Sequence, residues 1–125
     1  MKKLYKVNDS MYCIEVLLFI GTYKESEAYL KRGYGIGMGT QEFYSGCSMY
    51  LQDIKTKLAF NYIWMPEFTW TINNYVTLSH ECLHCAMNTM KLCNIPVAHD
   101  NHESLAYLHG FYFGELMNEL KEDRR

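Results

Sequence analysis

Two histidines four residues apart, His80 and His84, constrain the fold of this chain most. On an α-helix, positions i and i+4 lie about 40° apart around the axis, so both imidazoles reach one side only if this segment is helical. Thr69 or Thr71 can cap the first turn, and an Asn and a Pro that end helices follow Cys93. We therefore predict a long helix, ending at about Cys93, that presents both histidines on one face.

Glu81 follows the first histidine, so the segment HECLH has the form H-E-x-x-H. Glu81 lies at the edge of the histidine face, where its carboxylate can hold a water bound to a metal ion. This is the arrangement of the general base in a zinc hydrolase, in which two imidazoles hold the metal. The alternative is a chance match of three fixed positions, with the histidines as ordinary polar groups.

A catalytic zinc also needs a third protein ligand and an open position for water. Potential ligands cluster after the predicted helix, in the sequence HDNHE. They are His99, Asp100, His102 and Glu103.

The spacing of one of these candidates resembles a known family. Eighteen residues separate His84 from Glu103, which gives HExxH-x18-E, and NHESLAY resembles the N-E-x-x-A segment of gluzincins. Gluzincins are zinc metallopeptidases typified by thermolysin and the aminopeptidase N family. The resemblance covers residues 71–118 at most and implies that His80, His84 and Glu103 bind Zn²⁺ while Glu81 is the base.

A wider stretch, from HECLH through IPVAHDNHESLAYLHGF, is similar to small HExxH proteins encoded in bacteriophage genomes, which are regarded as metallopeptidases. This resemblance implies a phage origin and a place in the host cytoplasm. It implies no particular substrate.

Hydrolysis also needs a donor for the developing oxyanion. Tyr107, four residues after Glu103 and on the same helix face, can supply it or hydrogen-bond a ligand histidine. Thermolysin-like gluzincins have an Asp at that position, so Tyr107 departs from their pattern. His109 is a second candidate donor, or an ordinary histidine of the surface or core. Asn88 either lines the cleft or lies on the plain helix surface.

Small residues form one stripe on each of the last two predicted helices. Ala106, Gly110 and Gly114 share the face of Glu103, and the stripe of the preceding helix contains Cys82, Cys85, Ala86, Thr89 and Cys93. Close approach of the two stripes would bring Glu103 toward the histidines, although ordinary tight packing explains them equally well. We interpret the C-x-x-C of Cys82 and Cys85 as small core residues, with thiolate ligation or redox chemistry as alternatives. Five cysteines are an odd number, which disfavours a disulfide framework.

The rest of the chain predicts a small α+β domain. We expect a buried strand in residues 11–20, a helix in 23–32, paired strands in 43–51 and 57–65, and a last helix from about Asn101 to about Glu122. Residues 57–65 either form an edge strand that binds peptide by strand addition, or an ordinary core strand. The glycine-rich segment GYGIGMG between the first helix and the paired strands is interpreted as a loop or flat strand rather than a phosphate-binding loop.

The implied architecture is a minimal zincin-like fold spanning residues 1–125 as one domain. In this fold a small antiparallel or mixed sheet packs on the HExxH helix and the C-terminal helix.

Composition excludes several classes. Twelve basic against fourteen acidic residues give a net charge of −2, without the basic excess that nucleic-acid binding needs. The longest apolar run, residues 11–20, is about half of the roughly 20 residues that span a membrane. No cleavage site of a signal peptide follows it. We therefore expect a cytoplasmic protein that binds neither nucleic acid nor membrane.

These patterns predict a zinc-dependent hydrolase, most simply a small metallopeptidase acting on a peptide or protein. The alternative is an interaction protein on the same scaffold, which binds and neutralises a host protein without catalysis. Because only about 20 residues follow Glu103, the cleft would be shallow and open, and an oligomeric partner can supply its far wall.

Overall fold

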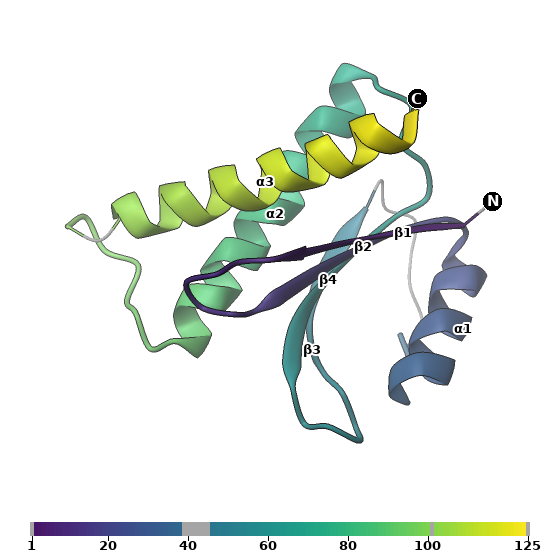
Figure 1. Cartoon of the computed structure of the whole chain (residues 1–125), viewed down its shortest axis with the longest axis horizontal. Helices are drawn as coiled ribbons and strands as arrows, with labels where there is room; N and C mark the ends of the chain where they lie inside the picture. Colours follow the sequence, from purple (N-terminus) through teal and green to yellow (C-terminus); the bar gives the residue numbers. More distant parts are fainter. Residues whose placement is uncertain (1, 39–45, 101, 125) are drawn as a thin grey trace.

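The computed structural model describes residues 2–38, 46–100 and 102–124 and consists of a four-stranded sheet and three helices (Figure 1). The strands are β1 (Lys3–Asn8), β2 (Glu15–Ile20), β3 (Cys47–Gln52) and β4 (Ala59–Met65). The helices are α1 (Tyr23–Tyr34), α2 (Ile72–Leu92) and α3 (His102–Arg124). The predicted α+β class is confirmed.

The sheet is mixed, with strand order β1-β2-β4-β3. The two central strands, β2 and β4, are parallel, and each pairs antiparallel with an edge strand. Of the two interpretations of residues 57–65, the core strand is confirmed and the edge strand is wrong, because β4 pairs on both sides. Among the described residues, β3 is instead the edge beyond β4.

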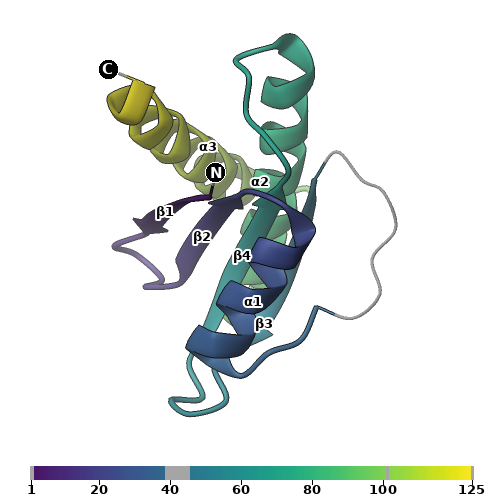
Figure 2. The same ribbon diagram turned by 90° about the vertical axis from the view of Figure 1, so that its right-hand side faces the viewer.

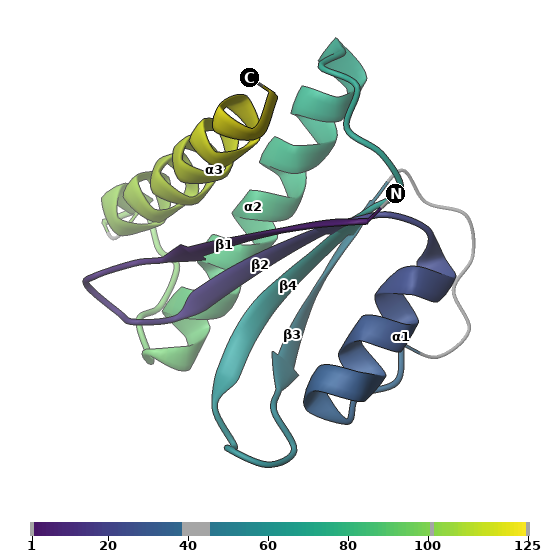
Figure 3. The ribbon, with the colours of Figure 1, turned by 45° about the vertical axis from the view of Figure 1, so that its right-hand side comes forward.

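The two faces of the sheet are covered by different helices, α1 on one face (Figure 2) and α2 with α3 on the other (Figure 3). Successive side chains of a strand point to opposite faces. Leu17 and Phe19 of β2 therefore pack in the α1 cluster, whereas Leu18 and Ile20 pack in the cluster of α2 and α3. This explains why β2 is an almost continuous apolar run.

Helix α1 begins with a capping box, in which the Thr22 hydroxyl accepts from the Glu25 amide and the Glu25 carboxylate accepts from the Thr22 amide. The predicted helix of residues 23–32 ends two residues early. Tyr34 is the last helical residue, and Gly35 caps the helix with a left-handed φ of 71° that suits glycine. The glycine-rich segment continues as coil to Met38, and its remainder lies outside the described residues.

Helix α2 begins where the sequence predicts. Thr71 is the N-cap, and its hydroxyl accepts from the Asn74 amide at 3.3 Å. The helix ends at Leu92, close to the predicted Cys93. Pro66 directly follows β4, and the segment 66–71 leads to the helix on the opposite side of the sheet from α1.

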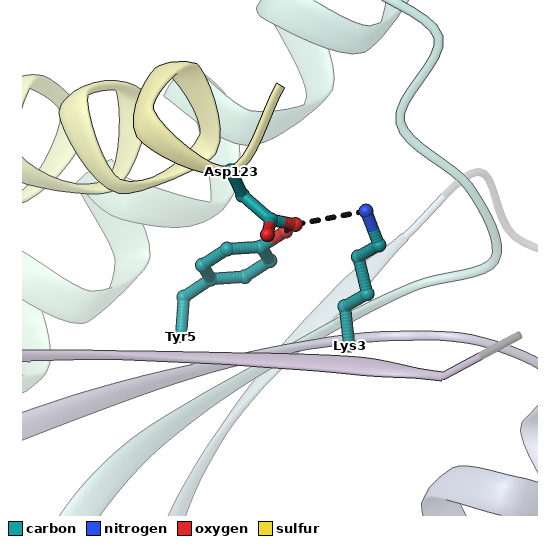
Figure 4. A network of polar contacts seen from close by, with 3 residues as sticks. All are labelled: Lys3, Tyr5 and Asp123. Carbon is teal, nitrogen blue, oxygen red and sulfur yellow. Dashed lines mark hydrogen bonds and ion pairs between the residues drawn. The ribbon is translucent and has the colours of Figure 1, made fainter. Parts of the chain in front are cut away.

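The C-terminal end of α3 is tied to β1, which brings the two ends of the chain together (Figure 4). One carboxylate oxygen of Asp123 accepts from Lys3 Nζ at 2.8 Å and from the Tyr5 hydroxyl at 2.7 Å. These two hydrogen bonds hold the pKa of the Asp123 carboxyl below its ordinary value, and the one from Lys3 has the larger effect. β1 was not predicted as a strand, although buried Tyr5 and Val7 alternate with exposed Leu4, Lys6 and Asn8.

Within the described ranges, none of the helices α1, α2 and α3 is both long enough and apolar enough to span a membrane.

Candidate metal centre

Helix α2 brings the two predicted imidazole ligands together. His80 Nε2 and His84 Nε2 lie 3.2 Å apart, and both side chains are exposed. One turn of helix separates the residues, so this meeting follows from their spacing. Together with Glu81 they form a group whose potential ligand atoms all lie within 4.8 Å of one another.

The separation of the two nitrogens fits one shared metal ion. Zinc binds imidazole nitrogen at about 2.0–2.1 Å in tetrahedral geometry, which places two ligand nitrogens about 3.3 Å apart. The observed 3.2 Å matches this value, although a hydrogen bond between one protonated and one unprotonated ring nitrogen gives the same distance. The two imidazoles, with the Glu81 carboxylate beside them, therefore fit a divalent metal, and the residues do not by themselves fix which one.

Glu81 has an unusual environment for a carboxylate, because only 7% of it is exposed. Within the described ranges no hydrogen bond or ion pair engages its side chain, and its carboxylate oxygens are not enclosed atoms, because no buried side-chain oxygen lacks a partner there. Buried charged groups are normally paired or bound to metal. Glu81 instead lines a hollow of about 370 Å³ together with His84 and Asn88 of α2.

The opposite wall of this hollow is the beginning of β3 and the residue before it, which are Gly46, Cys47 and Ser48. Ser48 lies opposite Ile63, a residue of the core beneath α2 and α3, so both side chains are on the α2 face of the sheet. The hollow therefore lies between the metal-ligand helix and the edge strand of the sheet.

The third predicted ligand, Glu103, is not part of this group. It lies in the first turn of α3 with its side chain 93% exposed, and its carboxylate is 3.8 Å from Nδ1 of its neighbour His102. His99 and Asp100, in the connection between α2 and α3, are exposed as well. Among the described residues, the structure brings none of the four candidates to the two histidines. Glu103 as a ligand stays a prediction.

The packing of α3 gives the reason for this placement. An added Cβ at Gly110 or Gly114 would meet nothing within 4 Å, so the small-residue stripe that contains Glu103 does not contact α2. The prediction that the stripe packs on the HExxH helix is wrong. Instead, α3 buries large side chains at every fourth position. They are Leu108, Tyr112, Leu116 and Leu120.

Within the described residues, no hydrogen bond or ring contact joins the two candidate donors of α3 to His80 or His84. Tyr107 is exposed, and its ring stacks on that of Phe111 at a centroid distance of 6.1 Å. Its role in catalysis stays a prediction. His109 is half-buried, with Nε2 3.0 Å from the carbonyl oxygen and 3.1 Å from the hydroxyl of Ser79. It therefore joins α3 to α2 one residue before His80.

The two cysteines within the motif are core residues, as predicted. Cys82 and Cys85 are fully buried, and burial raises the pKa of Cys82 to about 12, with a smaller contribution from Glu81. Burial likewise raises the pKa of Cys85 well above its ordinary value. Both shifts disfavour the thiolate form, which argues against a reactive redox pair.

Sequence reasoning missed Ser48 as a wall of the hollow. Of the two alternatives for Asn88, the structure supports the one in which it lines the hollow. The sequence did contain one signal of a polar contact between β4 and α2. Asn61 interrupts the apolar strand β4, and a buried amide of this kind needs a hydrogen-bond partner. That partner is Thr89 of α2, whose hydroxyl accepts from the Asn61 amide at 3.1 Å.

Comparisons with protein-family models, curated proteins and solved structures gave no match to this chain. The interpretation of the site therefore depends on its own geometry.

Proposed function

We propose that this protein is a zinc-dependent hydrolase, and specifically a small metallopeptidase with a minimal zincin-like fold. The observation that carries the proposal is the 3.2 Å separation of His80 Nε2 and His84 Nε2 beside Glu81, which is 7% exposed and lines the hollow. A site for a purely structural metal has no need of a carboxylate held beside the ligands.

The residues divide the work by their positions. His80 and His84 would hold the metal, and of these two His84 lines the hollow together with Glu81. When bound, zinc supplies a Lewis acid and lowers the pKa of water in its open position. Glu81 accepts the proton of the attacking water and then returns it to the leaving amine.

A polypeptide is the substrate class that suits the surroundings. The edge strand β3 forms one wall of the hollow, and an extended peptide can add to such an edge through main-chain hydrogen bonds. On the other side, the outer face of α2 is apolar around the histidines. This outer face comprises Ile72, Val76, Leu83 and Met87, all exposed.

The same outer face supports a second candidate function, an interaction protein that captures a target protein without cleaving it. Exposed apolar residues that gather on one helix face are typical of protein-binding surfaces. Under this alternative the metal positions or rigidifies α2, and Glu81 has no role in turnover.

The Glu81→Gln variant separates the two functions. We expect the zinc-loaded parent to cleave fluorescein-labelled casein, and Glu81→Gln to lose at least about 100-fold of that rate because the base is gone. Zinc content should be unchanged. The matched control is Glu115→Gln, an exposed glutamate of α3, which should retain the parental rate.

Equal rates in the parent and Glu81→Gln would refute the role of Glu81 as a base. Tight zinc binding without cleavage of casein or of a mixed peptide library would favour the interaction protein.

A further inference from the structure

A chain of buried hydrogen bonds runs from the hollow across the core to the loop between β1 and β2. Asn88 Nδ2 donates to Asn61 Oδ1 at 3.3 Å, and Asn61 Nδ2 donates to the Thr89 hydroxyl at 3.1 Å. The Thr89 hydroxyl lies 2.9 Å from the Tyr112 hydroxyl, which donates to Asp9 Oδ2 at 3.2 Å. Asn61, Thr89 and Tyr112 are fully buried, so these groups have no access to water.

The direction of the chain is fixed. Tyr112 gives its only hydroxyl proton to Asp9, so its oxygen must accept from Thr89, and the Thr89 oxygen then accepts from Asn61. At each step, the direction of one hydrogen bond therefore determines whether the next group donates or accepts. The chain therefore determines which way the Asn61 amide points, and through it the Asn88 amide.

Asp9 anchors this chain firmly. Its other carboxylate oxygen accepts from the backbone amides of Met11 and Tyr12 at 2.9 and 2.6 Å, and the residue is almost completely buried. A charged acceptor at one end polarises a chain of hydrogen bonds and strengthens its members. The Asn88 amide is thus held more rigidly than a helix-surface side chain ordinarily is.

Asn88 stands at the border of two hollows. One is the candidate site, which it lines with Glu81 and His84. The other, of about 650 Å³, is mostly apolar and lies at the end of α2. Its lining includes Met87, Lys91, Ile95, Pro96 and Val97. A ligand that extends from the metal site into this second hollow must pass Asn88.

We infer that Asn88 hydrogen-bonds a main-chain carbonyl of the polypeptide substrate beside the cleaved bond, with Asn61 and Thr89 as positioning residues. An Asn amide has two N–H groups, and only one of those of Asn88 is engaged by Asn61. An apolar side chain of the substrate then occupies the hollow formed by Met87 and Ile95–Val97. This inference rests on the proposed function and names the substrate that suits it.

A purely structural tie between β4 and α2 would use the same bonds, so loss of stability does not test the inference. Ligand affinity does, because only a contacting Asn88 changes it. Two probes separate the effects: acetohydroxamate, which has only a metal-chelating group, and N-acetyl-leucine hydroxamate, which adds a second carbonyl and an apolar side chain.

The test is titration of each probe into the cobalt-loaded protein, followed by the visible spectrum of the metal. We expect Asn88→Ala to weaken N-acetyl-leucine hydroxamate about fivefold to tenfold, as for one lost hydrogen bond, and acetohydroxamate less than about twofold. Thr89→Val should weaken the leucine probe in the same direction but less. Asn73→Ala, at an exposed position of the same helix, is the matched control and should change neither affinity.

Unchanged affinity of Asn88→Ala for the leucine probe would overturn the inference and leave the metal site intact. An equal loss for both probes would also overturn it, because the damage would then be at the metal. Failure of the parent chain to bind cobalt would instead refute the proposed function, and the inference would fall with it.

Discussion

The inner and outer faces of α2 differ in almost every respect, although they belong to one helix. The inner face is dense, with Leu78, Cys85 and Thr89 fully buried against the sheet and α3. The outer face exposes both histidines and apolar side chains such as Leu83. Packing explains the inner residues completely. It leaves the outer ones without a structural reason, and this is where a functional reason is needed.

The contrast between the two faces predicts different losses of stability when a leucine of each face is replaced by alanine. Leu78→Ala should lower the free energy of unfolding by about 2–5 kcal/mol, because it leaves a cavity beneath α2. Leu83→Ala, on the outer face, should cost less than about 1 kcal/mol. Urea denaturation of the metal-free protein measures both.

Equal losses for the two leucines would show that the outer face is covered in solution, by a second copy of the chain or by another segment. The contrast between the two faces would then be broken.

Much of this contrast can be predicted from the sequence. The i, i+4 spacing of His80 and His84 requires a helix, and Thr71 marks its start, so the ligand pair and its position follow from local rules. The strong apolar run of β2 and the aromatic strand β4 are likewise local signals. Predictions succeeded for these segments, each determined by one short stretch, whereas β1 was missed despite its alternating pattern.

The remainder depends on long-range packing. Glu103 has a family-like spacing from His84, but spacing along the chain does not say which face of α3 turns inward. The apolar side chains of Leu108 and Leu116 decide this by their larger buried area, and the small-residue stripe faces outward. Asn88 and Ser48 line the same hollow because the sheet order places β3 beside α2, which no local pattern encodes.

A smaller effect, on zinc affinity, is expected at Glu103, the third ligand that the spacing from His84 predicts. The exposed position of Glu103 predicts that Glu103→Ala changes zinc affinity less than about threefold, which is within the range expected for a distant surface charge. Competition with a chromogenic chelator measures the affinity. A loss of tenfold or more would instead support the spacing argument and show that the first turn of α3 reaches the histidines.

The most direct test of the central claim is elemental analysis of the untagged protein beside its His80→Ala/His84→Ala variant, after both have been offered zinc and dialysed. The geometry of the two imidazoles predicts one zinc per chain in the parent and none in the variant, with the metal raising the melting temperature of the parent alone. Equal zinc content in the two proteins, or no zinc in the parent, would contradict the assignment of this helix as a metal centre.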